Sequence, residues 1–272
     1  GELERAGTAL DGARAYFLAQ GAIERFLLHL GWGQFGIQEG DTRVAFRPGQ
    51  RQLRWEFPGG TVDLEITGES GKLDVYQTPP QVLARLFLGL GVDESRAYQI
   101  AGGIAAMRQT PTNVASGSSF SSQWPSFLQV EDLLKVPGMT PQIFYGWWER
   151  DAEGRLVERG GVGRHLTVVG ENALNVNYAA PVVLRAVGAP EDRIARILAV
   201  RATQVIENYS TGSPGAADAI SLGGGGSRAY TVRATAQLRD RPVRRTASAL
   251  VRFRRTRTEP PLSIVRWYST AN

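Results

Sequence analysis

Side chains that could do chemistry are few in this chain of 272 residues, and their types exclude several classes of site. There are no cysteines, which rules out disulfides, thiol nucleophiles, iron–sulfur clusters and zinc fingers. The two histidines, His29 and His165, stand far apart in the sequence, and neither belongs to a motif that would make it a general base. The glycines at 71 and 223–226 lack the pattern of a phosphate-binding loop. We therefore expect no enzyme.

Three carboxylates alternate along a short polar stretch: Glu149, Asp151 and Glu153, followed by Gly154. Alternating acids before a glycine can wrap a calcium ion, but an EF-hand loop needs more ligands and a distal glutamate. The spacing favours an ordinary turn, and we expect no metal there.

Arginine dominates the basic residues, because only Lys72 and Lys135 among the 31 are lysines. A cluster falls near the C-terminus, where Arg252 and Arg254 alternate with apolar residues as on a solvated strand face. The turn at 136–139 resembles that of helix-hairpin-helix DNA binders, but acidic residues stand beside it and would repel phosphate. Nucleic-acid binding by these features is the alternative function. The clustered arginines are Arg239, Arg241, Arg244, Arg245, Arg252, Arg254, Arg255 and Arg257.

The elements that position such residues begin with one long amphipathic helix over 2–30, which we expect to stop at Gly31. At 1.5 Å per residue it is roughly 43 Å long, more than short strands can cover. The second half, with Ile23, Leu27 and Leu30, is expected to lie against a sheet. The first half is expected to project with an apolar seam for partner helices, and its predicted partner-binding residues are Leu3, Ala6, Leu10, Ala13 and Phe17.

Beyond this helix the pattern changes twice. Strands are predicted at 43–47, 51–57 and 61–66, and again at 228–238, 243–254 and 262–268. Between them, 76–206 is mostly helical and 211–227 is a flexible connection. The order predicts an α+β fold, with a helix on an antiparallel sheet and an inserted helical domain. The predicted domains are 1–75, 76–206 and 207–272.

The helical block contains an internal sequence repeat. Residues 81–97 and 182–195 each read as a short helix, a glycine turn, an acidic start and a second helix. The segment 130–141 has the same shape, with Thr140 as a plausible cap and Pro141 at the first helical position. Three helix–turn–helix units predict a small all-α bundle.

Four segments, in the same order along the chain, resemble the type II secretion system minor pseudopilin K family, also called general secretion pathway protein K. They are 13–22 in the helix, the strand and Gly-Lys turn at 62–74, the segment 127–139, and 174–179 with its Asn175 and Asn177. The C-terminal strands ending in Trp267 and Tyr268 also fit. The resemblance covers essentially the whole chain.

The resemblance implies a pilin-like fold with a large all-α insertion of helix-hairpin-helix or SAM-like units. It implies a structural subunit at the tip of the periplasmic pseudopilus that helps to initiate assembly and protein export. Its implied partners are the minor pseudopilins of the I and J types, not nucleic acid, and a missing N-terminal helix would anchor the full-length form in the inner membrane. No cofactor is expected: calcium is bound by some members, but 108–113 replaces their Asp-rich segment here. Asn175 and Asn177 are expected to fix a turn.

Overall fold

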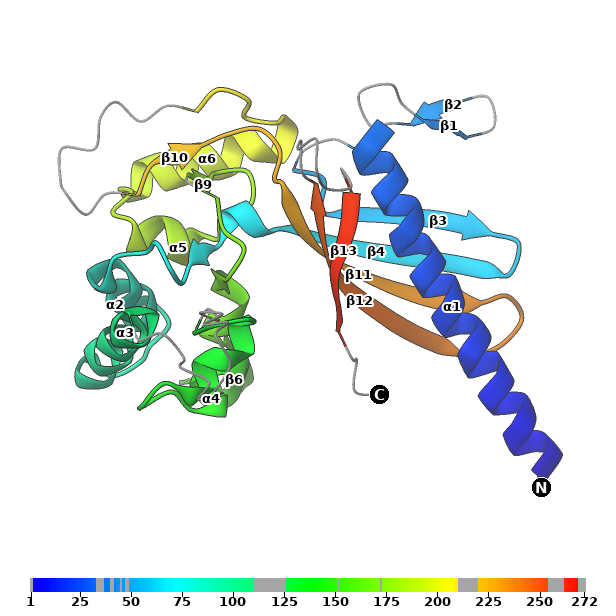
Figure 1. Ribbon diagram of the computed structural model, residues 1–272, viewed down its shortest axis with the longest axis horizontal. Coiled ribbons are helices and arrows are strands. Elements are labelled where there is room, and N and C mark those ends of the chain that lie inside the picture. The colour runs from blue at the N-terminus through cyan, green and yellow to red at the C-terminus, as the bar shows by residue number, and fades with distance from the viewer. Residues whose placement is uncertain are drawn as a thin grey trace, which may run out of the picture. The chain divides into compact units, whose positions relative to one another are not determined.

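The computed structural model describes residues 2–32, 37–39, 42–44, 46, 49–109, 126–150, 152–171, 173–209, 220–253 and 262–268 (Figure 1). These residues form two compact units. The first joins 1–69 to 225–272, and the second is the continuous segment 70–224. The chain thus leaves the first unit and returns to it.

A five-stranded antiparallel sheet forms the first unit together with helix α1 (Glu2–Trp32). The strand order is β13-β12-β11-β4-β3, so strands from both ends of the chain meet where β4 pairs with β11. The two segments of this unit therefore depend on each other to complete one sheet. The strands are β3 (Gln52–Phe57), β4 (Gly60–Gly68), β11 (Ala229–Leu238), β12 (Arg244–Phe253) and β13 (Leu262–Tyr268), and β1 (Ile37–Glu39) pairs separately with β2 (Thr42–Val44).

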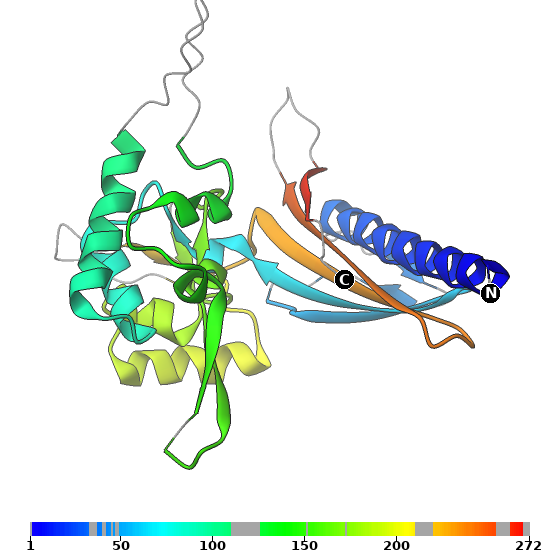
Figure 2. The same ribbon diagram turned by 90° about the horizontal axis from the view of Figure 1, so that it is seen from below.

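Alternation along the central strands explains why α1 covers one face of the sheet (Figure 2). Every second residue of β4 is buried, including Val62, Leu64 and Ile66, while the residues between them are exposed. Helix α1 packs against β12, β11 and β4 on the buried side. The predicted α+β class and antiparallel sheet are confirmed, and the five sheet strands lie where the sequence places them.

The helix runs further than predicted. It continues through Gly31 to Trp32 instead of stopping at the glycine. A Cβ at Gly31 would lie 2.5 Å from Leu262 Cδ1 of β13, so this glycine lies in close contact with the end strand and does not end the helix.

The second unit holds five α-helices among its described residues, with short strands and 3₁₀ turns between them. The helices are α2 (Pro80–Gly89), α3 (Glu94–Gln109), α4 (Pro141–Tyr145), α5 (Pro181–Ala186) and α6 (Glu191–Thr203). The 3₁₀ helices are η1 (Glu69–Gly71), which begins at the unit boundary, η2 (Val130–Lys135) and η3 (Val162–His165). The short strands are β5 (Leu73–Asp74), β6 (Gly146–Arg150), β7 (Leu156–Gly160), β8 (Leu166–Thr167), β9 (Leu174–Asn175) and β10 (Leu222–Gly223).

The internal repeat predicted at 81–97 and 182–195 is also a repeat in the structure, and it begins before the helices. The first strand of each parallel pair, β5 of β5–β8 and β9 of β9–β10, precedes a helix pair that turns at a glycine with positive φ, Gly91 or Gly188. Asp74 Oδ1 accepts the Tyr76 amide at 2.6 Å, and Asn175 Oδ1 likewise accepts the Asn177 amide at 2.9 Å. The predicted turn-fixing role of Asn175 is confirmed.

Each repeat is closed by an arginine from its second helix. Arg108 of α3 donates to the carbonyl oxygens of Tyr76 and Thr78, at 3.1 and 2.8 Å. Arg201 of α6 donates to those of Val176 and Ala179, at 3.0 and 2.6 Å. Both guanidinium groups thus satisfy carbonyls of the turn that enters the first helix of the repeat.

The third predicted helix–turn–helix unit is wrong in detail. Its first half is the 3₁₀ helix η2, and Val136 is extended with ψ 130° because it precedes Pro137. The second half begins as predicted, since the Thr140 hydroxyl accepts the Ile143 amide at 3.3 Å and Pro141 opens α4. Val136 and Met139 are buried, so this turn packs into the core.

Residues 146–160 form an antiparallel hairpin of β6 and β7, which the sequence reading treated as part of a helical block. The aromatic and β-branched residues of this stretch favour a strand over a helix. The Glu149 carboxylate of β6 connects the two strands. It accepts a hydrogen bond from the indole Nε1 of Trp147 at 3.0 Å and one from Nε of Arg159, on β7, at 2.5 Å.

The unit boundaries fall at 69/70 and 224/225, whereas the sequence placed domain boundaries at 75/76 and 206/207. The short strands explain the difference. Strand β5 lies before residue 75 but pairs with β8, and β10 lies after 206 but pairs with β9. Most of the predicted connection at 211–227 lies outside the described residues.

Candidate partner-binding surface on the N-terminal helix

Helix α1 is apolar on two opposite faces. The face against the sheet consists mainly of small residues as far as Ala22, with Ala15, Ala19 and Ala22 at 0% exposure. Ile23 and Phe26, also fully buried, continue this face. Small side chains let the helix backbone approach the sheet closely, and the two larger ones fill the space where the core widens.

The opposite face carries large apolar side chains in contact with solvent. Leu10 is 52% exposed, Phe17 68% and Leu28 54%. Steps of seven and eleven residues are close to two and three helical turns, so these side chains line up along about 27 Å of helix. Single exposed apolar residues are common, but an aligned set marks an interaction surface. We call Ala6, Leu10, Ala13, Phe17 and Leu28 the exposed stripe.

Four of the five predicted partner-binding residues belong to this stripe. Ala6, Leu10, Ala13 and Phe17 are all exposed and lie on one side of the helix. Leu3 lies in α1, but its side chain is outside the described residues. Sequence reasoning missed Leu28, although its spacing of eleven residues from Phe17 was a usable signal.

The predicted core half of the helix needs a correction. Ile23 is fully buried as expected, but Leu27 and Leu30 are only half-buried, and Phe26 and His29 take the central positions. Burial also begins earlier than expected, at Gly12 and Ala15, and Gly12 lies against Arg245 of β12. Side-chain burial therefore differs less between the two halves of the helix than between its two faces.

Polar contacts fix the edges of the helix. Asp11 accepts Arg14 of the same helix at 3.5 Å and lies 3.7 Å from Arg241 Nε in the β11–β12 turn. Further along, the Arg25 guanidinium lies over the rings of Trp55 and Phe57, 5.0 and 5.4 Å from their centres. These contacts hold the helix on the sheet without covering the exposed stripe.

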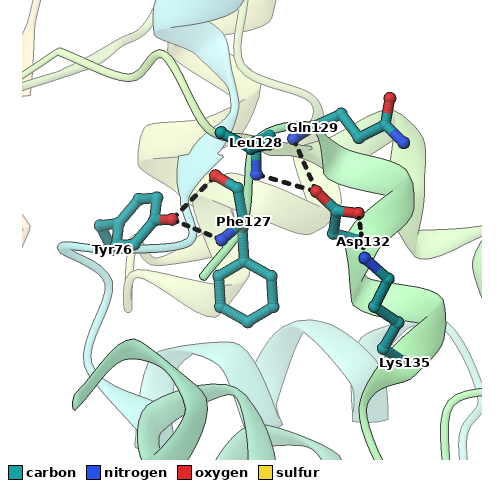
Figure 3. Close-up of polar contacts among 6 residues, drawn as sticks. All are labelled: Tyr76, Phe127, Leu128, Gln129, Asp132 and Lys135. Atoms are coloured by element: carbon teal, nitrogen blue, oxygen red, sulfur yellow. Dashed lines mark hydrogen bonds and ion pairs between the residues drawn. The ribbon is translucent and has the colours of Figure 1, made fainter. Parts of the chain in front are cut away.

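In the second unit, the segment 127–139 that carries part of the family resemblance is anchored by side chains (Figure 3). The Tyr76 hydroxyl donates to the Phe127 carbonyl at 2.8 Å and accepts the Phe127 amide at 2.7 Å. Asp132 accepts the Leu128 and Gln129 amides at 2.8 and 3.0 Å, and Lys135 Nζ at 2.7 Å. Burial opposes ionisation of Asp132, but these hydrogen bonds outweigh it and lower its pKa. The segment has a structural role.

Both histidines are accounted for by packing. His29 is buried and stacks on Trp55, with ring centres 5.0 Å apart. Burial, with the nearby charges of Arg164 and Lys72, lowers the pKa of His165 to about 4. A neutral histidine beside two cations has no carboxylate to orient it as a base.

The residues that could hold calcium do not fit a cation site. Glu149 is paired with Arg159, Glu153 with Arg155, and Asp151 lies outside the described residues. The guanidinium of Arg108 donates to the carbonyl oxygens of Tyr76 and Thr78, so a positive charge already lies against these two oxygens. In the part of the chain that the structure describes, no three His, Cys, Asp or Glu side chains gather as metal ligands would.

Within the sheet, two of the strand arginines face acids. Arg233 lies opposite Glu65 in the β4–β11 ladder, and Arg54 lies 3.6 Å from Asp63. Arg254, Arg255 and Arg257 fall outside the described residues. The described arginines of the cluster concentrate instead at the β11–β12 turn.

The fold and the surface define a class of protein: a long helix on an antiparallel sheet, interrupted by a helical unit, with an apolar stripe left open on the helix. The sequence matches no family profile and no curated protein. The fold is similar to that of a chain in the crystal structure of the GspK-GspI-GspJ complex from the type 2 secretion system of enterotoxigenic Escherichia coli, with a TM-score of 0.55 and 14% identity. The similarity covers 98% of this chain and 100% of that chain. The predicted resemblance is thus confirmed at the level of the fold.

Among the described residues, no helix is both long enough and apolar enough to cross a membrane.

Proposed function

We propose that this chain is a minor pseudopilin of the K type, a structural subunit of the periplasmic pseudopilus of a type II secretion system. The fold similarity supports the pseudopilus class, since it extends over 98% of this chain. The inserted helical unit is interpreted as the family's helix-hairpin-helix or SAM-like insertion. A catalytic role is not proposed, because the titratable side chains discussed above have structural partners.

The observation that carries the proposal is the exposed stripe of α1. Its leucines and phenylalanine lie opposite the buried face, so no strand of the chain's own sheet covers them. Helices with apolar side chains at such spacing pack against other helices by fitting ridges into grooves. We infer that the stripe packs against the N-terminal helices of the I-type and J-type minor pseudopilins at the pseudopilus tip.

In this proposal the subunit starts in the inner membrane, held by an N-terminal helix that continues α1, and then helps to initiate assembly and export. The proposed domains follow the two units, with the pilin-like part in the first. The GspK-GspI-GspJ complex is described as an assembly of three proteins, which suggests the partners to test.

The test is reconstitution with the soluble domains of the I-type and J-type pseudopilins encoded in the same genome. Size-exclusion chromatography with light scattering should show a complex containing all three chains. Phe17→Asp, which places a charge on the exposed stripe, should abolish it while leaving the thermal midpoint of the chain alone unchanged. A wild-type chain that stays monomeric with both partners present would contradict the proposal.

A further inference from the structure

Arginines gather at one point of the first unit, where the β11–β12 turn lies beside the first half of α1 (Figure 1). Arg239, Arg241, Arg244 and Arg245 fall close together in the chain and are all exposed. Arg14 of α1 joins them, with 63% of its side chain exposed. We call these five residues the arginine patch.

Contacts with the helix fix the patch in place. Asp11 lies between Arg14, at 3.5 Å, and Arg241, at 3.7 Å. The guanidinium of Arg245 lies over Gly12, where an added Cβ would be 3.3 Å from Nη2. The absence of a side chain at Gly12 therefore gives Arg245 room against the helix.

The positive charge of the patch is only partly neutralised by the described residues around it. Asp11 and Asp240 are the acids within it, against five arginines. The other hydrogen-bond partners of these arginines are uncharged: the Gln237 side chain for Arg244 at 2.7 Å, the Arg244 carbonyl for Arg245 at 2.9 Å, and the Phe57 carbonyl for Arg239 at 3.5 Å. By contrast, Arg233 on the central strand β11 lies opposite Glu65.

The patch borders the exposed stripe. Arg14 of the patch follows Leu10 of the stripe by four residues, so these two side chains are neighbours on the helix surface. Asp11, on the sheet side of Arg14, links it to Arg241. A partner that covers Leu10 must therefore bring its own surface next to Arg14, at the edge of the patch. Guanidinium groups bind carboxylates with paired, charge-assisted hydrogen bonds.

We propose that the arginine patch binds acidic side chains beside the packing helix of a neighbouring pilin-like subunit, and so selects that subunit and its register along α1. This inference rests on the proposed function. Discrete carboxylates suit the patch better than a duplex or a membrane surface, because Asp11 and Asp240 would face a continuous negative charge. The stripe supplies affinity, and the patch supplies selectivity and speed of association.

The experiment compares two quadruple variants that each remove four charges from the net charge of +5. Arg239, Arg241, Arg244 and Arg245 become glutamine in one, and Arg85, Arg96, Arg193 and Arg196 of the second unit become glutamine in the matched control. Binding to the soluble I-type and J-type pseudopilins is measured by interferometry at several salt concentrations. Equal thermal midpoints of the first unit in both variants verify that folding is intact.

The patch variant should bind about tenfold more weakly than wild type at about 50 mM salt, chiefly through slower association, and the gap should close near 500 mM. The control should stay within about twofold of wild type, because its arginines lie far along the chain from the helix. Replacing the four patch arginines by lysine should restore most of the affinity, since the charge is kept.

Equal affinity and salt dependence of the patch and control variants would overturn the inference while leaving the proposed function intact. So would a patch variant that binds both pseudopilins normally but loses binding to duplex DNA or to phosphatidylglycerol vesicles. A wild-type chain that binds neither pseudopilin, with Leu10→Asp making no difference, would overturn the proposed function and this inference together.

Discussion

The two faces of α1 have similar apolar composition but opposite environments. The buried face combines Ala15, Ala19 and Ala22 with Ile23 and Phe26, whereas the exposed stripe is built on Leu10, Phe17 and Leu28. The difference lies in where the large side chains stand. On the buried face they are confined to the second half, whereas on the exposed side they stand at 10, 17 and 28, with Gly21 and Glu24 between the last two. Stability and association should therefore respond to different substitutions on one helix.

The largest expected effect is from a charge on the buried face. Ile23→Asp places a carboxylate at a site with 0% exposure, without a partner, and should cost about 4 kcal/mol or more. Urea unfolding followed by circular dichroism measures this cost. Leu28→Asp, five residues away on the exposed stripe, is the matched control and should change the free energy of unfolding by less than about 0.5 kcal/mol. Similar losses for both variants would remove the distinction between the faces.

A second prediction concerns how the stability of the second unit depends on pH. His165 in the second unit has its pKa lowered to about 4, below the ordinary value of 6.5, so the unfolded chain binds the proton more readily than the folded one. Its contribution to stability is complete above about pH 6.5 and is lost as the pH falls toward 4, by up to about 3 kcal/mol.

His165→Gln should therefore flatten the acid side of the stability curve for the second unit. Urea midpoints at pH 7, 5 and 4 test this, with the difference between wild type and variant isolating the histidine from the carboxylates. An unchanged slope between about pH 6.5 and 4 in the variant would show that His165 is not kept neutral by folding.

A smaller effect on stability is expected when a larger side chain, rather than a charge, is introduced on each face of α1. Ala19→Leu inserts a large side chain between helix and sheet and should destabilise the first unit by about 1–3 kcal/mol. Ala13→Leu makes the same change on the exposed stripe, and its free energy of unfolding should stay within about 0.5 kcal/mol of wild type. Thermal melts of the two variants give the comparison, and equal destabilisation would place Ala13 in the core.

Local sequence patterns predicted much of this fold. Period-two alternation located β4 and β11, and glycine turns located the two helix pairs. Local sequence patterns could not predict which strands pair with one another across long stretches of the chain. Strands of two residues, such as β5 and β9, have no period to detect, and their partners β8 and β10 determine which unit they join.

The surface on α1 was predictable only in part, for a related reason. When a helix is apolar on both sides, periodicity identifies two stripes but does not say which one meets the sheet. Ala6, Leu10, Ala13 and Phe17 are exposed as expected, but Leu27 was assigned to the core and Leu28 was missed. The choice depends on how α1 packs against β12 and β11, where Gly12 lies against Arg245, and no local signal in the helix specifies that packing.

The most direct test of the central claim uses Leu10→Asp, with association and stability measured on the same sample. Leu10 is 52% exposed, so the thermal midpoint should stay within about a degree of wild type. Binding to the I-type and J-type pseudopilins should fall by about a hundredfold or more, because the charge would be buried in the helix contact. A variant that unfolds as readily as Ile23→Asp, or one that binds both partners like wild type, would contradict the account.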